Sequence, residues 1–452
     1  MSTASIGARI DRLPVGKFHW KLFYIVAVGM FFEGFDIYIA ASVLAGTTST
    51  GFSTFAQNGL FISATFVGMT LGALLTGFLG DRYGRRRTYQ WNLLLFGAAA
   101  IASAFAPDMQ TLIILRFLMG LGLGAENVVG YSIIAEFFPS KTRGRWAGMI
   151  CTAVTLGLPA SAIMAWLLIP IFGWRVMFVL GGIGALIAWL LRTKLPESPR
   201  WLEIAGRGAE AEKLVSEIER EIERERGALP APDLTPPPAI ARDLGQLFRE
   251  PLLSRVIVGS VSLMVVNTLI YGFIVWMPTF FVSQGQTITK STGFALLMAL
   301  GGPLGSTLGA LACDALGRKV TIVGSALIGV LLSAAFALST DVLVTVSLGF
   351  LLTIPIYVLV AALFAVYIPE IFPTEFRLRG VGLCNAVGRS ASIIVPLFIG
   401  PVFVSYGVVG VLSVMSAALL LMAVVVALLG IEPSRMGSAD LDEAKRPVPA
   451  AS

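Results

Sequence analysis

The sequence contains little charge. Only 13% of its 452 residues are Asp, Glu, Lys or Arg, whereas 56% are apolar, and the mean hydropathy is +0.83. A soluble chain of this length needs far more charge to cover its surface. The composition therefore excludes a soluble domain. The net charge of +6 does not indicate a nucleic-acid partner.

Histidine and cysteine are also scarce. His19 is the only histidine and precedes the first apolar run, so a proton-handling group inside a membrane is expected to be a carboxylate. Cys151, Cys313 and Cys384 lie in apolar runs without ligand spacing, which predicts neither a disulfide nor a metal cluster. No nucleophile–base pair, metal set or cofactor loop is present, so we expect no enzyme and no cofactor.

Long apolar runs fill most of the chain. A helix needs about 20 apolar residues to cross a bilayer. The sequence therefore predicts an all-α membrane protein with twelve transmembrane helices, six in each of two halves. The predicted spans are 22–46, 57–80, 88–106, 109–135, 144–170, 174–193, 253–282, 292–313, 320–338, 342–368, 378–404 and 407–430.

Basic residues in the short connections predict the orientation. Connections 81–87, 136–145 and 314–319 carry several cations each, whereas the opposite connections carry only Arg175 and Lys290. The positive-inside rule then places both termini in the cytoplasm. The expected segments are a cytoplasmic N-terminus (1–21), a six-helix bundle (22–193), a cytoplasmic helical linker (194–252), a second bundle (253–430) and a cytoplasmic tail (431–452).

The two halves share a repeated sequence pattern. The signature G-x-x-x-D-x-x-G-R-[RK] occurs as GFLGDRYGRR from Gly77, and about 233 residues later as ALACDALGRK from Ala310, with alanine in place of the first glycine. Two motifs repeating at almost one offset indicate a duplicated chain, which is typical of secondary transporters. In the second motif, Glu136, Pro139, Arg143 and Arg145 recur as Glu370, Pro373, Arg377 and Arg379.

These basic loops resemble the signature of the major facilitator superfamily. PESPRWL from Pro196, PEIFPTEFR from Pro369 and RFLMGLGLG from Arg116 are similar to its sugar-porter-type branch. The seventh span, VVNTLIYGFIVWMP from Val265, lacks the glutamines of sugar porters, and EGFD from Glu33 is similar to the D-G-x-D motif of aromatic-acid:proton symporters.

The resemblance implies proton-coupled symport of a small organic acid, an aromatic or aliphatic carboxylate, by alternating access. A proton-coupled exporter of drugs or metabolites and a sugar:proton symporter remain alternatives. The expected partners are a small substrate, protons and the lipid bilayer, with no nucleic acid. We expect a monomer in a cell inner membrane.

Proton coupling is assigned to charged residues within the first and fourth spans. Intramembrane charge is costly and marks function. In similar carriers an aspartate and an arginine pair until protonation separates them, which implies this role for Asp36 and Arg116; a permanent structural salt bridge is the alternative. Glu33 lies within about 60° of Asp36 on one helix face. Glu126 points about 80° away from Arg116 and is placed to contact the second or fifth span.

Substrate binding is assigned chiefly to Arg389. Its span contains no acidic residue, so the guanidinium is expected to bind a substrate carboxylate or to pair with a facing residue such as Glu126. Asn267 offers a hydrogen bond, and Tyr271 and Trp276 could clamp an apolar body, although Trp276 could equally be a packing residue. The further candidates are Asn127, which shares a face with Arg116, and Tyr131 and Asn385.

A charged network at the cytoplasmic ends of the helices is predicted to act as a gate. Opposite charges there could pair in one state and separate in another, biasing a two-state equilibrium. The predicted gate residues are Asp81, Arg85, Glu136, Arg143, Glu197, Asp314, Arg318, Glu370 and Arg377.

Overall fold

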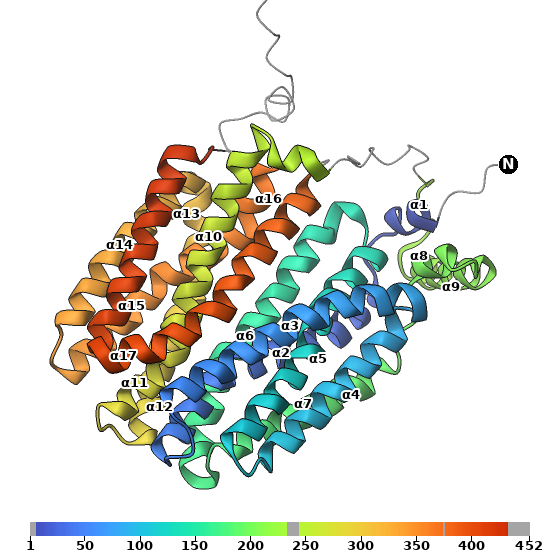
Figure 1. The fold of residues 1–452 in the computed structure, drawn as a ribbon. Coiled ribbons are helices and arrows are strands. Elements are labelled where there is room, and N and C mark those ends of the chain that lie inside the picture. The colour runs from blue at the N-terminus through green and yellow to red at the C-terminus, as the bar shows by residue number, and fades with distance from the viewer. Residues whose placement is uncertain (1–5, 233–243, 374–375, 433–452) are drawn as a thin grey trace, which may run out of the picture. The chain divides into compact units, whose positions relative to one another are not determined.

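The computed structural model describes residues 6–232, 244–373 and 376–432, apart from a few side chains, and all regular structure in these ranges is helical (Figure 1). The chain divides into two compact units. The first comprises Met1–Gly46 with Ala64–Pro237, and the second comprises Thr47–Ser63 with Pro238–Ser452. The connection between the first two spans thus belongs to the second unit.

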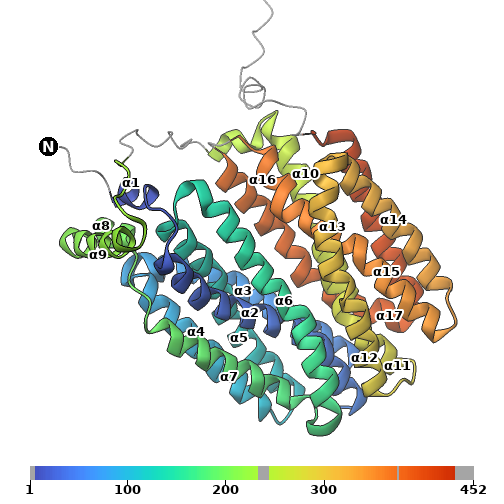
Figure 2. The same cartoon turned by 180° about the vertical axis from the view of Figure 1, so that it is seen from behind.

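The first unit holds six long helices and three short or peripheral ones. Figures 1 and 2 agree that α4 and α7 lie side by side and that α1 lies near α8 and α9. The helices are α1 Ile6–Asp11, α2 Lys17–Ser49, α3 Phe55–Tyr83, α4 Arg85–Ala104, α5 Met109–Phe137, α6 Ser140–Phe172, α7 Arg175–Arg192, α8 Pro199–Ile204 and α9 Gly208–Arg226.

The second unit has more interrupted helices. A 3-10 turn breaks the path between α10 and α11 just before Pro278, and a π-helical stretch follows α15. The elements are η1 Leu244–Phe248, α10 Leu252–Gly272, η2 Ile274–Trp276, α11 Met277–Ser283, α12 Ile288–Ala299, α13 Gly301–Leu316, α14 Arg318–Leu338, α15 Val342–Val360, η3 Ala361–Tyr367, α16 Ile368–Ile371 and α17 Arg377–Leu429.

The helices account for twelve membrane spans. Ten helical stretches among the described residues are long and apolar enough to cross a bilayer. The 53-residue α17 contains non-helical Gly407 (φ 63°, ψ −160°) and supplies two spans, one before this residue and one after it. The twelfth is α4, whose hydropathy is lowered by the three arginines at its start. Two halves of six spans confirm the predicted fold.

The two copies of the repeated motif adopt the same backbone conformation. Gly84 (φ 93°) precedes α4, and Gly317 (φ 90°) precedes α14. A positive φ is readily adopted only by glycine. The glycine before the basic pair of each copy therefore lets the chain reverse between consecutive spans.

The linker helix α9 is anchored to the N-terminal helix α1. Its buried Val215 packs with Ile10 of α1, while Arg9 contacts Glu219 and Glu212 at 2.5 Å each. Burial raises the pKa of Glu219, but hydrogen bonds from Arg9 and Arg12 outweigh burial and hold that pKa below its usual value. The linker thus begins as an ordered part of the first unit.

Candidate functional site

A buried ion pair joins α2 and α5. Arg116 Nη1 lies 2.6 Å from Asp36 Oδ2, and the two side chains are 1% and 0% exposed. Arg116 also donates from Nη2 to the Asp36 carbonyl oxygen (2.9 Å) and from Nε to Thr65 Oγ1 (3.0 Å). Asp36 Oδ1 has no hydrogen-bond partner among the described residues. The carboxylate therefore keeps one oxygen open to a proton while the other holds the arginine.

A second buried ion pair joins α5 and α7. Arg192 donates from Nη1 to Glu126 Oε2 (2.5 Å) and from Nη2 to Glu126 Oε1, and Nη2 also contacts the Val26 carbonyl oxygen at 3.4 Å. The Arg192 guanidinium lies 3.7 Å from the centre of the Tyr89 ring, and Tyr89 donates to Glu126 Oε1 (3.3 Å). Glu126 therefore pairs with Arg192, within its own unit.

Arg192 and Tyr89 are not among the residues predicted from the sequence. Arg192 ends the sixth span and precedes Lys194, so it resembles an ordinary flanking cation. The available signal was its position inside the predicted span, since an intramembrane arginine needs a counter-ion.

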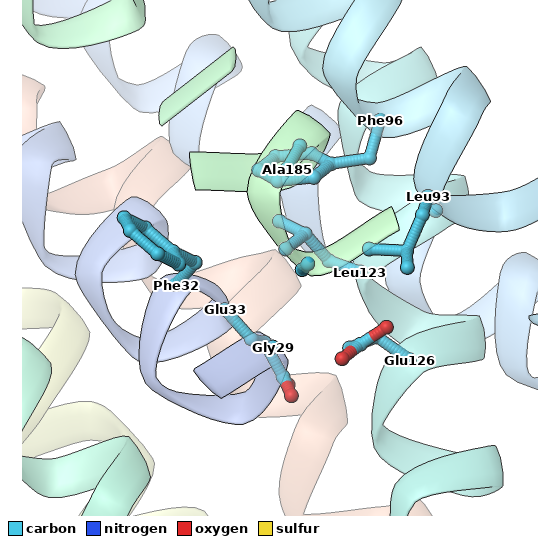
Figure 3. Close-up of a pocket in the computed structure, with 10 residues that line it drawn as sticks. Gly29, Phe32, Glu33, Leu93, Phe96, Leu123, Glu126 and Ala185 are labelled. Carbon is cyan, nitrogen blue, oxygen red and sulfur yellow. The ribbon is translucent and has the colours of Figure 1, made fainter. Parts of the chain in front are cut away.

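Glu33 and Glu126 line one small cavity. It measures about 10 Å³, close to the least that holds one water molecule. Figure 3 shows both carboxylates pointing into the same region from α2 and α5, beside Leu93 of α4. Glu33 is 1% exposed and Glu126 is 3% exposed. Two acids therefore line one small, mostly apolar cavity, and Glu126 is also the acid of the second ion pair.

Close helix packing holds this cluster together. A Cβ atom added to Gly29 of α2 would collide with the Arg192 guanidinium and the Glu126 carboxylate. A glycine at this position is what lets both side chains approach the α2 backbone.

In the second unit, Arg389 has no ion pair or hydrogen bond with any described residue, and it is half-buried. On the adjacent α10, Asn267 donates to the Gly388 carbonyl oxygen (3.2 Å) and to the Leu263 carbonyl oxygen (2.8 Å). Asn267 thus lies beside the backbone that carries Arg389. Asn385, one turn before Arg389, donates to the carbonyl oxygen of its own helix at Val381 (2.9 Å).

Trp276 lies in an aromatic stack of the second unit. Its ring is parallel to those of Phe55 (6.2 Å between centres, 7°) and Phe280 (6.0 Å, 25°), and Phe280 stacks on Phe403 at 4.3 Å. Trp276 is 0% exposed, and its Nε1 has no hydrogen-bond partner among the described residues. In this state the indole packs against aromatic rings.

Three substrate candidates remain, two on α10 and α5 and one whose side chain is not described. Tyr271 is half-buried on α10, and Tyr131 is half-buried on α5 beside Cys151. The side chain of Asn127 lies outside the described residues.

The predicted gate residues that the structure describes make charged contacts within each unit. In the first, Arg85 Nε lies 3.3 Å from Glu136 Oε1, and Glu197 accepts from the backbone N–H of Arg85 (2.8 Å) and Arg86 (3.2 Å). Arg143 contacts Asp11 of α1 at 3.4 Å.

The second unit repeats this arrangement. Arg318 Nε lies 2.9 Å from Glu370 Oε2, and Asp314 lies 3.6 Å from Arg318. Glu432 accepts from the backbone N–H of Arg318 (3.1 Å) and Lys319 (2.8 Å), as Glu197 does at α4. Glu432 is not among the residues predicted from the sequence, although it follows the last span as Glu197 follows the sixth. The side chains of Asp81 and Arg377 lie outside the described part of the chain.

Twelve spans in two repeated halves, with ionisable groups buried at membrane depth, define a multi-pass membrane transporter. The chain belongs to the Major Facilitator Superfamily, whose family pattern matches residues 26–396. This confirms the predicted family and class, which are those of transporters and not of enzymes.

Curated relatives are bacterial metabolite transporters. The chain is 38% identical to the inner membrane metabolite transport protein YdjE of Escherichia coli (97% of this chain, 98% of the relative). It is 33% identical to the niacin transporter NiaP of Acinetobacter baylyi (94% and 97%), and 26% identical to the 4-hydroxybenzoate transporter PcaK of Pseudomonas putida (85% and 86%).

The fold is also that of a solved transporter. The crystal structure of a D-xylose-proton symporter superposes with a TM-score of 0.70 at 19% identity, covering 92% of this chain and 99% of the other. At this identity the likeness concerns the fold alone.

Proposed function

We propose that this transporter couples the movement of a proton to the uptake of a small monocarboxylate, in particular one with an aromatic ring. The observation that carries the proposal is the fully buried Asp36–Arg116 pair, with one carboxylate oxygen open. A proton on Asp36 cancels the charge that holds Arg116, so protonation and the position of α5 relative to α2 become linked. Because the pair is buried away from water, one proton on Asp36 is enough to remove the ion pair that holds Arg116.

Arg389 supports a carboxylate as the substrate. A guanidinium within a membrane span requires an anion, because it stays protonated at all relevant pH values. No described residue supplies that anion. A planar carboxylate matches the guanidinium by two parallel hydrogen bonds. Asn267 and Asn385 lie near enough along α10 and α17 to contribute neutral hydrogen bonds.

The relatives support an aromatic acid. Niacin and 4-hydroxybenzoate, named for two of them, both join one acid group to one small ring. The proposed cycle imports such an anion with a proton by alternating access, with both termini in the cytoplasm. With one proton the transported pair is neutral, so the pH gradient drives it.

The test uses proteoliposomes that contain a pH-sensitive dye. We expect external nicotinate or 4-hydroxybenzoate to acidify the lumen, and we expect Asp36→Asn to abolish this signal. Asp108→Asn is the matched control, because Asp108 is an exposed helix cap and Asn caps equally well. Protein-free liposomes report passive permeation of the acid.

A second arm tests the role of Arg389. Nicotinate and nicotinamide differ at the group that Arg389 is proposed to bind. Since hydrogen bonds to charged groups contribute about 1.5–3 kcal/mol, Arg389→Gln should weaken nicotinate binding about 10- to 150-fold. Arg224→Gln, on the exposed face of α9, is the control.

Signals from D-xylose alone would favour sugar transport, and alkaline signals from organic cations alone would favour export.

A further inference from the structure

An exposed apolar stripe on α3 ends in an arginine. Leu71, Leu75 and Phe78 follow one another at helical spacing and are all exposed, Phe78 by 77%. Arg82 lies four residues after Phe78, on the same face, and is also exposed. A spanning helix turns such an apolar face to the acyl chains of the bilayer. Arg82 therefore lies where this stripe reaches the polar headgroups.

The next span, α4, carries a matching stripe. Trp91 and Leu94 are exposed, and Arg87 lies one turn before Trp91 on the same face and is exposed as well. The helix α3 ends at Tyr83 and α4 begins at Arg85, so both stripes end in an arginine on the same side of the membrane.

Aromatic contacts join the ends of the two stripes. Gly84 (φ 93°) reverses the chain, and the Tyr83 ring packs edge-on against Trp91 with 5.5 Å between ring centres. The Arg82 guanidinium lies 5.4 Å from the centre of the Tyr83 ring. Tyrosine and tryptophan favour the boundary between acyl chains and water. One exposed surface, which we call the basic–aromatic patch, thus runs through Arg82, Tyr83, Trp91 and Arg87.

The charge of the patch is not neutralised by the residues that the structure describes. Among them, neither the Arg82 nor the Arg87 side chain has an ion-pair or hydrogen-bond partner. The Glu197 carboxylate lies beside Gly84, but it accepts hydrogen bonds from backbone N–H groups at the start of α4. Two exposed guanidinium groups therefore remain available to an anion.

We propose that the basic–aromatic patch binds the phosphate of an anionic phospholipid such as phosphatidylglycerol, with the acyl chains along the stripes of α3 and α4. A phosphate accepts paired hydrogen bonds from a guanidinium, and basic clusters at the membrane surface attract anionic headgroups. The proposed orientation places the patch at the cytoplasmic leaflet, where anionic lipids give a negative surface potential.

The apolar stripes favour a lipid over a soluble phosphate compound. A soluble anion would use the two arginines alone, whereas a phospholipid also covers the exposed Phe78, Trp91 and Leu94. The patch lies in the first unit and uses none of the residues assigned to the proton or the substrate. The lipid site therefore stands whether or not a carboxylate is transported.

The first test measures lipid contact at Trp91 in the full-length protein. Nanodiscs of phosphatidylcholine receive a small share of phosphatidylglycerol with brominated acyl chains or, in parallel, of phosphatidylcholine with the same chains. Bromine quenches tryptophan fluorescence on contact, and the difference between the wild type and Trp91→Phe isolates the Trp91 signal. We expect brominated phosphatidylglycerol to quench Trp91 at a lower mole fraction than brominated phosphatidylcholine. Equal quenching by the two lipids would overturn the proposal.

The second test removes the two cations. Each arginine near an anionic surface contributes about 5-fold in affinity, so Arg82→Gln with Arg87→Gln should raise the phosphatidylglycerol fraction that half-quenches Trp91 about 25-fold. Arg220→Gln with Arg224→Gln, which alters two exposed arginines of α9, is the matched control and should leave that fraction unchanged. Each curve is divided by that of brominated phosphatidylcholine in the same variant, so a loss of folded protein cancels. A double variant that keeps the wild-type preference would refute the assignment to these arginines.

A third arm distinguishes a lipid from a soluble anion. Glycerophosphoglycerol carries the same headgroup without acyl chains, and inorganic phosphate carries the charge alone. At constant ionic strength, we expect an excess of either compound to leave the quenching by brominated phosphatidylglycerol unchanged. Displacement of the brominated lipid by either one would assign the patch to a soluble phosphate compound and overturn the choice of a lipid.

Discussion

Replacing Glu126 by Gln would leave the Arg192 guanidinium inside the protein without its counter-ion. Arg192 is 1% exposed, so water cannot replace the lost charge. Removing one partner of a buried ion pair costs about 3–5 kcal/mol. The Tyr89 ring remains, and a desolvated cation–π contact contributes about 2 kcal/mol whether or not Glu126 is charged. That contact is present in both proteins and cancels in the difference, so we expect Glu126→Gln to lower the free energy of unfolding by about 3–5 kcal/mol.

The second variant removes both charges. Arg192→Met retains much of the side-chain volume, and replacing a whole buried pair by uncharged groups is often neutral. We expect Glu126→Gln with Arg192→Met to lie within about 1 kcal/mol of the wild type. Unfolding is followed by tryptophan fluorescence during denaturant titration in detergent. Glu210→Gln, which breaks the exposed pair with Arg207, is the matched control and should leave the unfolding midpoint unchanged, because water screens exposed charges.

Glu33 provides an internal check on this reasoning. It lines the same cavity as Glu126 and interacts electrostatically with Arg192, so its carboxylate could partly offset the Arg192 charge once Glu126 is neutral. The cost of Glu126→Gln should therefore be larger in the Glu33→Gln background than in the wild type. This account of the cluster would be refuted if Glu126→Gln cost no stability in either background. It would also be refuted if Glu126→Gln with Arg192→Met were no more stable than Glu126→Gln alone.

Three further changes follow from packing, capping and pH. Gly29→Ala should destabilise the protein by about 1–3 kcal/mol in the same titration, because a Cβ collides with the buried charges, whereas Gly148→Ala meets open space and should not. Glu432→Gln should slow initial uptake while leaving KM unchanged, because Glu432 caps α14 in the gate network; a raised KM would contradict that role. The low folded-state pKa of Glu219 means that its contribution to the docking of α1 is present above the unfolded pKa of about 4.3 and is lost as pH falls through the folded value. The protection of α1 against hydrogen exchange, relative to the intrinsic rate at each pH, should thus be constant above about pH 4.3 and fall below it, and Glu219→Gln should remove that dependence.

The sequence by itself determined the class, the fold and the duplication. Hydropathy fixes which segments enter a bilayer. Backbone N–H and C=O groups find no water there, so they must bond to one another within long apolar helices. The repeated glycine and arginine motif predicted two equivalent turns, and Gly84 and Gly317 do share one backbone conformation. Asp36 and Arg116 were also identified, because charge at membrane depth is rare enough to be noticed one residue at a time.

Only the tertiary structure decided which charges meet. Glu126 contacts Arg192, 66 residues further along the chain, and Glu432 caps a helix that begins 114 residues earlier. Such pairings depend on the rotation and contact of neighbouring helices. Small residues such as Gly29 permit a close contact, but the sequence does not show which side chains will meet there. Trp276 illustrates the same limit, since its spacing fits a cavity while packing buries it against Phe55. Spacing fixes the face of a single helix, whereas the partner of each side chain is set by how the helices pack together.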